Sequence, residues 1–593
     1  MTAKLVSEVL AETVKIHGAR PALKVKRGGS WQTTSWDDYS KQARRAARAM
    51  MKLGLAPKES VVLIGFNSPE WVIADVGAIL ASGVPAGIYT TNTPAQCRYI
   101  AAHSEARIAF AENDMQVKKF LAVKSELPRL VAIVQMLGEP KAEGVLSWER
   151  FLAEGDGVTE AQLDARIAEQ KPDDVCTLIY TSGTTGDPKA VMLSHENLTW
   201  TAETVARELG FSSEEVSISY LPLSHIAEQM LTLHGPLRIG STVHFAESLE
   251  ALPDNLREVK PTYFLGVPRV WEKMQAKMMA AGAAAPPLRK KLVAWAKKVG
   301  LEGGYAMQRG EKPGLAYAIA SKLVFSKVRE RLGFDRLRVP VTGAAPISKD
   351  TLEFFLSLGI PILEVYGMSE CTGPASFSTP TAFRTGKAGR VAPGTELKIA
   401  EDGEICYRGK HIFKGYLKDE AATRAAIDEE GWLHSGDIGT LDADRYVQIT
   451  DRKKDLLITA GGENIAPQVI EGALKALPIV SQAVVLGDRK KFLTALLTID
   501  VERLAQEAQI CGSEAKDPEA AAKDPTFFAH VEKLVAEVNA TLARVQTIKK
   551  FALLPTDFSI EGGELTPTMK VKRKIVNEKY KSQIEALYEG AAD

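Results

Sequence analysis

The 593-residue chain is too long for a single compact core, so its length predicts more than one domain. Its 74 lysine and arginine residues balance its 74 aspartate and glutamate residues, and a chain without net charge offers nucleic acid or an anionic membrane no overall attractive field. The five cysteines are too few and too scattered for a disulfide framework or a zinc site, which favours a reducing compartment. We therefore expect a cytoplasmic protein, with peripheral membrane contact as the open alternative.

Strand-like and helix-like segments alternate through the first two thirds of the chain. The first 25 residues predict a short amphipathic helix and then a strand, and the apolar period of residues 36–54 predicts a longer helix. The most apolar stretch, 71–89, contains Asp75, Pro85 and three interior glycines, so we expect a buried helix running into a strand rather than a membrane span. Further apolar runs that predict strands lie at 60–66, 106–111, 130–136 and 175–181. This alternation predicts layered α/β structure with largely parallel sheets.

The sequence pattern changes near Gly386, where long alternating segments give way to short ones. From there, short apolar runs separated by turns, including 415–419, predict a small β-rich subdomain or barrel over residues 386–450. A charged connector follows at 451–455, and after it comes a small α+β unit. The expected division is an N-terminal domain over 1–450, a hinge over 451–455 and a C-terminal lid domain over 456–593.

Two helical segments stand apart from the rest. Residues 274–313 are rich in alanine and lysine and predict an exposed helical insertion. Residues 501–548 predict a charged helical segment that contains a solvated loop or helix cap at 515–525.

The strongest signal for chemistry follows the strand predicted at 175–181. Gly183 and Gly186 allow a tight turn that brings backbone N–H groups close to an anion, and Lys189 adds a positive charge. The candidate phosphate-binding residues are Thr181, Ser182, Gly183, Thr184, Thr185, Gly186 and Lys189. The segment is not a Walker A loop, because Pro188 precedes the lysine and Ala190 follows it. Composition alone leaves an ordinary Ser/Thr/Gly surface loop as the alternative.

Several longer motifs occur in order along the chain. They are YTSGTTGDPKAVMLSH (180–195), LPLSHIAEQ (221–229), TGAAP (342–346), VYGMSE (365–370), GWLHSGDIG (431–439), DRKKDLLITAGGENI (451–465) and LTPTMKVKR (565–573). With these motifs the chain resembles the adenylate-forming superfamily of acyl-CoA synthetases, luciferases and nonribosomal adenylation domains. LPLSHIAEQ, FLGVPRVWEK (264–273), VYGMSECTGP and LTPTMKVKR look like its long-chain acyl-CoA synthetase branch, closest to the bubblegum type.

The resemblance implies both a fold and a reaction. The fold is a large α/β N-terminal domain with a small β-barrel subdomain, followed by a small mobile α+β C-terminal domain. In the reaction, the carboxylate of a long-chain fatty acid attacks the α-phosphorus of ATP, pyrophosphate leaves, and the thiol of CoA then displaces AMP. ATP, Mg²⁺ and CoA are thus implied, with fatty acid and CoA as partners and no nucleic acid.

The resemblance also assigns residues to the nucleotide. Glu370 matches the family's metal ligand, and a carboxylate beside phosphates with no His or Cys cluster suits Mg²⁺. Tyr366 matches the aromatic residue that packs against adenine, and Asp437 matches the acid that accepts the ribose hydroxyls. The remaining ATP- or AMP-binding residues implied are Gly343, Ala344, Ala345, Gly367, Ser369 and Arg452.

Five further residues are implied by the two half-reactions. Lys570 matches the C-terminal lysine that reaches the carboxylate and α-phosphate during adenylation, and His225 matches a position beside the substrate carboxylate. Lys454 matches the hinge about which the C-terminal domain rotates, and Gly461 and Gly462 match the loop that lines the CoA tunnel afterwards. Taken alone, His225 reads as a buried core histidine.

The sequence leaves other functions open. A fatty acyl-AMP ligase that passes its acyl group to a carrier protein is the nearest, and a luciferase-like oxygenase shares the first step. A non-catalytic adenylate or lipid binder is disfavoured because Lys570 and Glu370 are both present. The basic residues 572–574 are expected at a solvated strand edge, with contact to CoA phosphates as the alternative.

Overall fold

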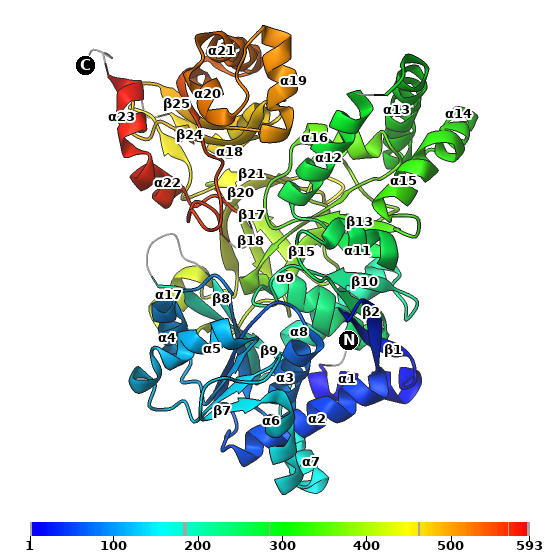
Figure 1. Cartoon of the computed structure of the whole chain (residues 1–593), viewed down its shortest axis with the longest axis vertical. Coiled ribbons are helices and arrows are strands. Elements are labelled where there is room, and N and C mark those ends of the chain that lie inside the picture. Colours follow the sequence, from blue (N-terminus) through cyan, green and yellow to red (C-terminus); the bar gives the residue numbers. More distant parts are fainter. Residues whose placement is uncertain (1–2, 182–186, 284, 461–462, 567–568, 590–593) are drawn as a thin grey trace.

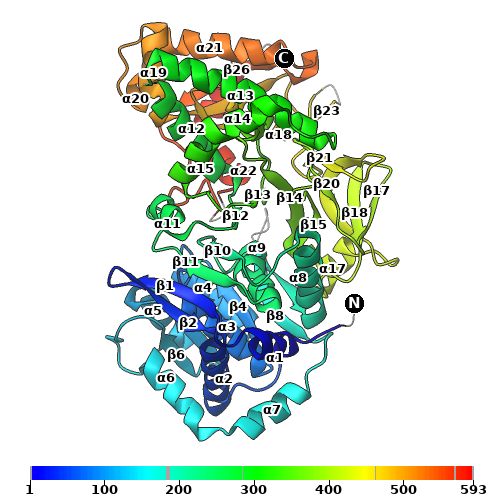
Figure 2. The ribbon, with the colours of Figure 1, turned by 90° about the vertical axis from the view of Figure 1, so that its right-hand side faces the viewer.

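The computed structural model describes residues 3–181, 187–283, 285–460, 463–566 and 569–589 (Figure 1). Viewed from the side, the C-terminal part lies across one end of the long N-terminal part (Figure 2). The expected α/β architecture, with a large N-terminal and a small C-terminal part, is confirmed. Within the described ranges, no helix combines the length and the apolar character that crossing a membrane requires.

An eight-stranded sheet forms the base of the N-terminal part. Its strands, in spatial order, are β19 (Gly415–Tyr416), β9 (Lys189–Ser194), β8 (Val175–Thr181), β4 (Val84–Ile88), β3 (Ser60–Ile64), β5 (Ile108–Ala111), β6 (Ala132–Gln135) and β7 (Val145–Ser147). The strands from β8 to β7 in this order run parallel, whereas β9 is antiparallel to β8 and to β19. Helices cover both faces, which is why the central strands are continuous apolar runs.

The helices of this region confirm most of the predicted elements. They are α1 (Val6–His17), α2 (Trp36–Lys52), α3 (Pro69–Leu80), α4 (Pro94–His103), α5 (Asp114–Leu121), α6 (Trp148–Glu154), α7 (Glu160–Ala168) and α8 (His195–Leu209). Residues of α2 and α3 pack on one face of the large sheet, and residues of α4 and α5 pack on the other. The apolar stretch 71–89 is therefore a buried helix and strand, as predicted.

The N-terminal part contains two further sheets, of four and five strands. One has the order β10 (Val216–Ser219), β11 (Thr242–Phe245), β1 (Pro21–Arg27), β2 (Ser30–Ser35); the other has the order β12 (Tyr263–Leu265), β13 (Val339–Thr342), β14 (Leu363–Met368), β15 (Gly373–Phe377), β16 (Arg390–Val391). Their helices are α9 (Ile226–Gln229), α10 (Gly235–Ile239), α11 (Leu252–Val259), α12 (Pro268–Ala283), α13 (Pro287–Gln308), α14 (Leu315–Ala320), α15 (Ser326–Leu332) and α16 (Lys349–Leu356). The segment 274–313 is helical, as predicted.

The β-rich subdomain is an antiparallel sheet of four strands. Their order is β17 (Glu396–Ile399), β18 (Glu404–Arg408), β20 (Leu433–Leu441) and β21 (Val447–Arg452), with α17 (Glu420–Ala426) before β20. Throughout 386–452 the recorded strand pairs do not join β17 to β21, so the sheet is open rather than closed into a barrel. The predicted strand at 415–419 also lies elsewhere, because β19 pairs with β9 in the large sheet.

The C-terminal part has a core of its own. Its elements are β22 (Leu457–Ile458), β23 (Asn464–Ile465), α18 (Pro467–Lys475), β24 (Val480–Leu486), β25 (Leu493–Ile499), α19 (Val501–Cys511), α20 (Pro518–Lys523), α21 (Pro525–Asn539), β26 (Ile548–Leu554), α22 (Arg573–Lys579) and α23 (Lys581–Tyr588). Strands β24, β25 and β26 form one sheet, and two apolar clusters pack between it and the helices. Asp517 and Asp524 cap α20 and α21, which confirms the predicted capping segment.

The basic residues 572–574 do not form the expected strand edge. Arg573 begins α22, and its guanidinium donates to both carboxylate oxygens of Glu471 at 2.6 Å and to the carbonyl oxygen of Val485 at 3.2 Å. The expectation was wrong because the half-buried arginine ties α22 to α18 and β24 inside the C-terminal part, a contact that sequence spacing does not reveal.

Candidate active site

The candidate site lies where one C-terminal hairpin meets the strand ends of the N-terminal part. Strands β14, β20 and β21 carry four of the predicted nucleotide residues, and α9 begins beside His225. Most of the predicted phosphate loop, residues 182–186, lies outside the described residues. So do Gly461 and Gly462 of the predicted CoA tunnel.

The two described ends of the phosphate loop are held together by strand pairing. Thr181 ends β8, Lys189 begins β9, and the two are antiparallel partners. The Thr181 hydroxyl also donates to the Lys189 carbonyl oxygen at 3.4 Å. The segment between them is therefore closed at its base, as expected of a loop that leaves and re-enters one sheet.

Glu370 sits in a buried 3₁₀ turn that follows β14 directly. Its carboxylate accepts a hydrogen bond of 2.7 Å from the hydroxyl of Tyr416, a residue of β19. The ammonium of Lys189 lies 5.0 Å from the centre of the same tyrosine ring and 3.9 Å from the Asp419 carboxylate. Tyr416 thus connects the predicted metal ligand to the predicted phosphate-binding lysine.

Sequence reasoning missed Tyr416. Burial and the neighbouring Glu370 carboxylate raise the pKa of its phenol well above the ordinary value, so the hydroxyl remains a donor. The tyrosine lies in the segment GYLKD. A single aromatic residue in such a short predicted strand indicates a role in core packing rather than in a functional site. Only the pairing of β19 with β9 brings it to Glu370.

Tyr366 and Arg452 both bind Asp437. The Tyr366 hydroxyl donates to one oxygen of the Asp437 carboxylate at 2.6 Å, and Nε of Arg452 lies 3.2 Å from the other oxygen. Asp437 and Arg452 are register partners in β20 and β21, so the sheet itself sets their distance. Burial raises the pKa of Asp437, and the positive charges of Arg452, Lys570 and Lys454 oppose that rise.

A bulge in β14 directs Tyr366 toward Asp437. The register of β14 against β15 shifts between Tyr366 and Gly367. A Cβ atom at position 367 would lie 1.7 Å from the carbonyl oxygen of Gly373, so only glycine fits there. Bulges of this kind re-aim neighbouring side chains, which gives Gly367 a structural reason for its place in the motif.

Three small residues predicted to line the base, 343–345, follow β13 directly. Ala344 has a positive φ of 68°, a strained conformation for a residue with a Cβ, and such strain persists only where the surroundings hold it. Gly343 is buried and Ala345 is half-buried. Ser369, beside Glu370, is buried.

His225 is held as a neutral imidazole. Its Nδ1 accepts a hydrogen bond of 3.2 Å from the backbone N–H of Ala227, so the ring proton is assigned to Nε2. Burial, and then the positive charge of Lys570, lower the pKa of His225 to about 3. The ring therefore offers one N–H donor next to the Lys570 ammonium.

Lys570 reaches this place from a hairpin of the C-terminal part. The backbone N–H of Thr566 donates to the Lys570 carbonyl oxygen at 2.8 Å, and that of Lys572 donates to Glu564 at 2.7 Å. Burial and the charge of Arg452 lower the pKa of Lys570 to about 8, whereas the carboxylates of Asp437 and Glu370 act in the opposite direction. The charge of one cation is thus coupled both to the predicted ribose-binding acid and to the predicted metal ligand.

The connector 451–455 runs past the same residues. Lys454 is exposed, and its charge acts on both Asp437 and Lys570. Its neighbour Lys453 pairs with Asp402 at 2.6 Å and with Glu404 at 3.1 Å.

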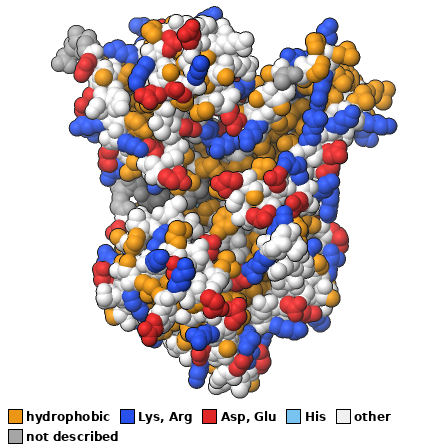
Figure 3. Space-filling model, viewed as in Figure 1, with side chains coloured by type: hydrophobic (Ala, Val, Ile, Leu, Met, Phe, Trp, Pro, Cys, Tyr) orange, Lys and Arg blue, Asp and Glu red, His pale blue; other side chains and the backbone are white. Residues whose placement is uncertain are grey.

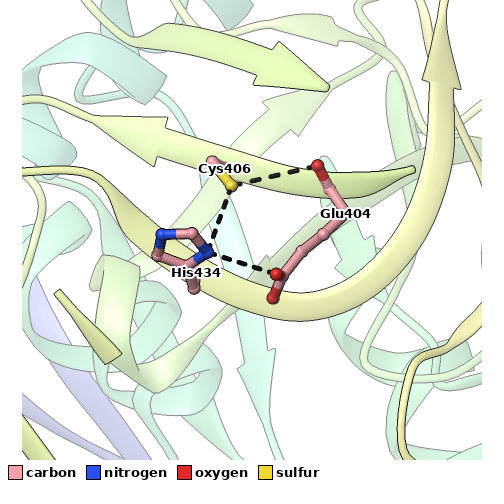
Figure 4. A group of neighbouring side chains, drawn as sticks. All are labelled: Glu404, Cys406 and His434. Atoms are coloured by element: carbon pink, nitrogen blue, oxygen red, sulfur yellow. Dashed lines mark hydrogen bonds and ion pairs between the residues drawn. The ribbon is translucent and has the colours of Figure 1, made fainter. Parts of the chain in front are cut away.

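A second cluster with metal-ligand chemistry lies beside this connector (Figure 4). Sγ of Cys406 is 3.6 Å from Nδ1 of His434, and a Glu404 carboxylate oxygen is 3.1 Å from the same nitrogen. These spacings resemble those between ligands of tetrahedral zinc. Lys453, however, already neutralises that carboxylate, and the N–H of Gly436 donates to its other oxygen at 2.8 Å. We assign the cluster to bracing β18 against β20.

Known proteins resemble this chain over nearly its full length. The model of the AMP-binding enzyme family matches residues 10–417, and the model of the AMP-binding enzyme C-terminal domain matches residues 454–592. The long-chain-fatty-acid–CoA ligase ACSBG2 of Xenopus laevis is 46% identical over 99% of this chain and 84% of its own length. The human ligase ACSBG1 is 41% identical over 98% of this chain and 85% of its own length.

Solved structures share the fold over the whole chain. The anthranilate CoA ligase AuaEII in complex with anthranoyl-AMP superposes with a TM-score of 0.76 at 19% identity and covers 99% of both chains. ATP-bound MatB from Rhodopseudomonas palustris superposes with a TM-score of 0.73 at 21% identity, over 98% of this chain and 100% of its own.

Proposed function

This chain belongs to the AMP-binding enzyme family, and on that premise we propose that it is a long-chain fatty acid–CoA ligase. A fatty acid carboxylate attacks the α-phosphorus of ATP and releases pyrophosphate, and the CoA thiol then attacks the acyl carbon and releases AMP. The observation that carries the proposal is that Lys570, in the C-terminal part, lies close enough to Asp437, Glu370 and His225 of the N-terminal part for its charge to be coupled to theirs.

Asp437 is proposed to hold the ribose. Each carboxylate oxygen has two lone pairs, and the structure uses one on each oxygen, for Tyr366 and for Arg452. The two that remain suit the two ribose hydroxyls. We place adenine against Tyr366 and the segment 343–345, where small side chains leave room for a flat ring.

Glu370 is proposed to bind Mg²⁺ between it and the ATP phosphates. Its bond to Tyr416 occupies one oxygen and fixes the carboxylate in one orientation, which leaves the second oxygen for a hard cation. Lys189, Thr181 and Ser369, with the loop 182–186, are proposed to contact the phosphates. A magnesium ion bound there would supply charge neutralisation for the departing pyrophosphate.

Lys570 and His225 are proposed to act on the carboxylate. An ammonium at this position offsets negative charge on the carboxylate and α-phosphate as the new bond forms. His225 is neutral, so its Nε2–H can donate a hydrogen bond to the substrate carboxylate and orient the acyl group. Because Nδ1 already accepts from Ala227, the ring does not take a proton from Lys570.

The second half-reaction is proposed to need a domain rotation. In one arrangement Lys570 occupies the site; in the other, the loop with Gly461 and Gly462 replaces it and admits CoA. We propose 451–455 as the hinge, with Lys454 at its centre, between domains 1–450 and 456–593. The separate apolar clusters on either side of this connector support the boundary.

The test is a pyrophosphate-release assay with saturated acids of graded length, run with and without CoA. We expect CoA-dependent turnover with long acids and a single burst of pyrophosphate when CoA is absent. A burst that CoA does not turn into turnover, but a carrier protein does, would favour the acyl-AMP ligase reading. Absence of pyrophosphate with every acid would contradict the proposal.

A further inference from the structure

Helices α13, α14 and α15 form a lobe that projects at the upper right of Figure 1, opposite the C-terminal part. A π-helical turn, Ser321–Phe325, joins α14 to α15. The inner face of the lobe is closed by a small apolar cluster of Ala296, Ala320, Val324 and Phe325. The lobe therefore has its own packing and does not need its outer face for stability.

The outer face carries large apolar side chains at helical spacing. In α13 these are Leu288, Leu292 and Trp295, at positions i, i+4 and i+7; Leu288 is 83% exposed and Trp295 38%. The second helix and the π-turn add exposed Leu315, Ile319 and Leu323. These six are among the eighteen exposed large apolar side chains of the described chain, yet they fall within 288–323. Such a concentration marks an interaction surface.

The lobe is also strongly basic. Residues 285–332 contain eleven lysines and arginines and three glutamates, although the whole chain has no net charge. Figure 3 shows blue and orange side chains gathered over this lobe. Six exposed lysines have no ion pair within the part of the chain that the structure describes: Lys290, Lys291, Lys298, Lys312, Lys322 and Lys327. These cations are free to meet an external anionic surface.

We propose that this lobe docks on the surface of an anionic lipid bilayer. Leucine, isoleucine and tryptophan side chains enter the boundary between headgroups and acyl chains, while neighbouring lysines contact anionic headgroups. A second copy of this chain is a poorer occupant, because two lobes of the same charge repel each other. The inference goes beyond the proposed function, and the binding assay below needs neither ATP nor fatty acid.

The test is co-sedimentation of the full chain with phosphatidylcholine vesicles that contain or lack phosphatidylserine, at low and high salt. We expect binding to the anionic vesicles that weakens as salt rises. Lys290→Glu with Lys291→Glu should lower the partition coefficient at least about tenfold through lost attraction. Leu288→Ser with Leu315→Ser should lower it by at least a similar factor, about tenfold, through lost apolar burial.

Matched controls place the same changes on other exposed surfaces. Lys516→Glu with Lys533→Glu, and Ile510→Ser with Val501→Ser, should bind vesicles like the wild type. Pyrophosphate release with soluble acid should stay unchanged in the lobe variants, which verifies their folding. Equal binding by wild type and lobe variants would overturn the proposal. So would a lipid-free dimer that Leu288→Ser with Leu315→Ser dissociates, because the face would then join two copies.

Discussion

The two sides of the proposed site are held in place by different means. On the N-terminal side, Tyr366, Asp437 and Arg452 stand on paired strands and are bonded to one another. On the C-terminal side, Lys570 stands near the tip of a hairpin and reaches the site only because its whole domain is docked.

The docking itself rests on few polar contacts. Arg269, at the start of α12, donates to Asp557 at 2.9 Å and to the hydroxyl of Ser481 at 2.6 Å. Lys475 pairs with Glu272 at 3.1 Å. If the C-terminal part rotates as proposed, the nucleotide side stays in place while Lys570 leaves, so changes on the two sides should separate the two half-reactions.

The largest expected effect is that of Lys570→Ala. Removal of a preorganised donor costs about 10²–10³ in rate, and we expect that loss in adenylation. Thioester formation from preformed acyl-AMP should change little, because in the proposed rotation Lys570 leaves the site before this step. Single-turnover assays of each half-reaction measure this, with Lys572→Ala as the control. Equal losses in both half-reactions would contradict the assignment of Lys570 to adenylation alone.

The pH dependence of adenylation gives a second test of the role of Lys570. The ammonium of Lys570 must be charged to act, and its pKa is lowered to about 8. For adenylation, kcat/KM should therefore fall as pH rises through about 8, approaching about tenfold per pH unit above it. Thioester formation should not show this limb. In Lys570→Arg the limb should shift out of range; a limb that persists there belongs to another group.

A smaller effect is expected for Arg269→Ala, which touches no substrate. Loss of the hydrogen bonds to Asp557 and Ser481, each worth about 0.7 kcal/mol net, should loosen the docked arrangement and slow adenylation about tenfold. Thioester formation should be unchanged or faster, because the same loosening favours rotation. Arg257→Ala, at an exposed pair within the N-terminal part, is the control. Parallel losses in both steps would indicate general unfolding instead.

The smallest effect on activity is expected from Asp75→Asn in α3. Burial raises the pKa of Asp75 to about 8, so between pH 4 and 8 the native state holds a proton that the unfolded chain releases. Wild-type stability should thus fall as pH rises through this range, and the variant should escape that fall.

The measurement is the thermal midpoint at several pH values. We expect the gap in favour of Asp75→Asn to widen with pH up to about 8 and to close near pH 4. The ratio of the two half-reaction rates should stay constant, since Asp75 lies in the core of the N-terminal part, away from the contacts between the two parts. A gap that does not vary with pH, or that appears equally in Asp164→Asn, would show that Asp75 does not titrate in this way.

Much of the fold was predictable because local patterns carry it. The strand 175–181 and the helix within 36–54 follow from apolar periodicity that packing preserves. The predictions of a barrel and of a strand edge at 572–574 were wrong, because strand closure and the pairing of Arg573 with Glu471 depend on partners distant in the sequence. Candidates such as Asp437 and Glu370 came from the resemblance of short motifs to those of a known family.

By itself, the sequence determined which reactive groups the protein carries and in what order, since motifs and turns are written in neighbouring residues. Only the folded chain brings Tyr416 to Glu370 and places Lys570 within electrostatic range of Asp437. The physical reason is that these contacts join segments brought together only when separate sheets and domains bury their apolar faces, and no spacing along the chain specifies the distance between them.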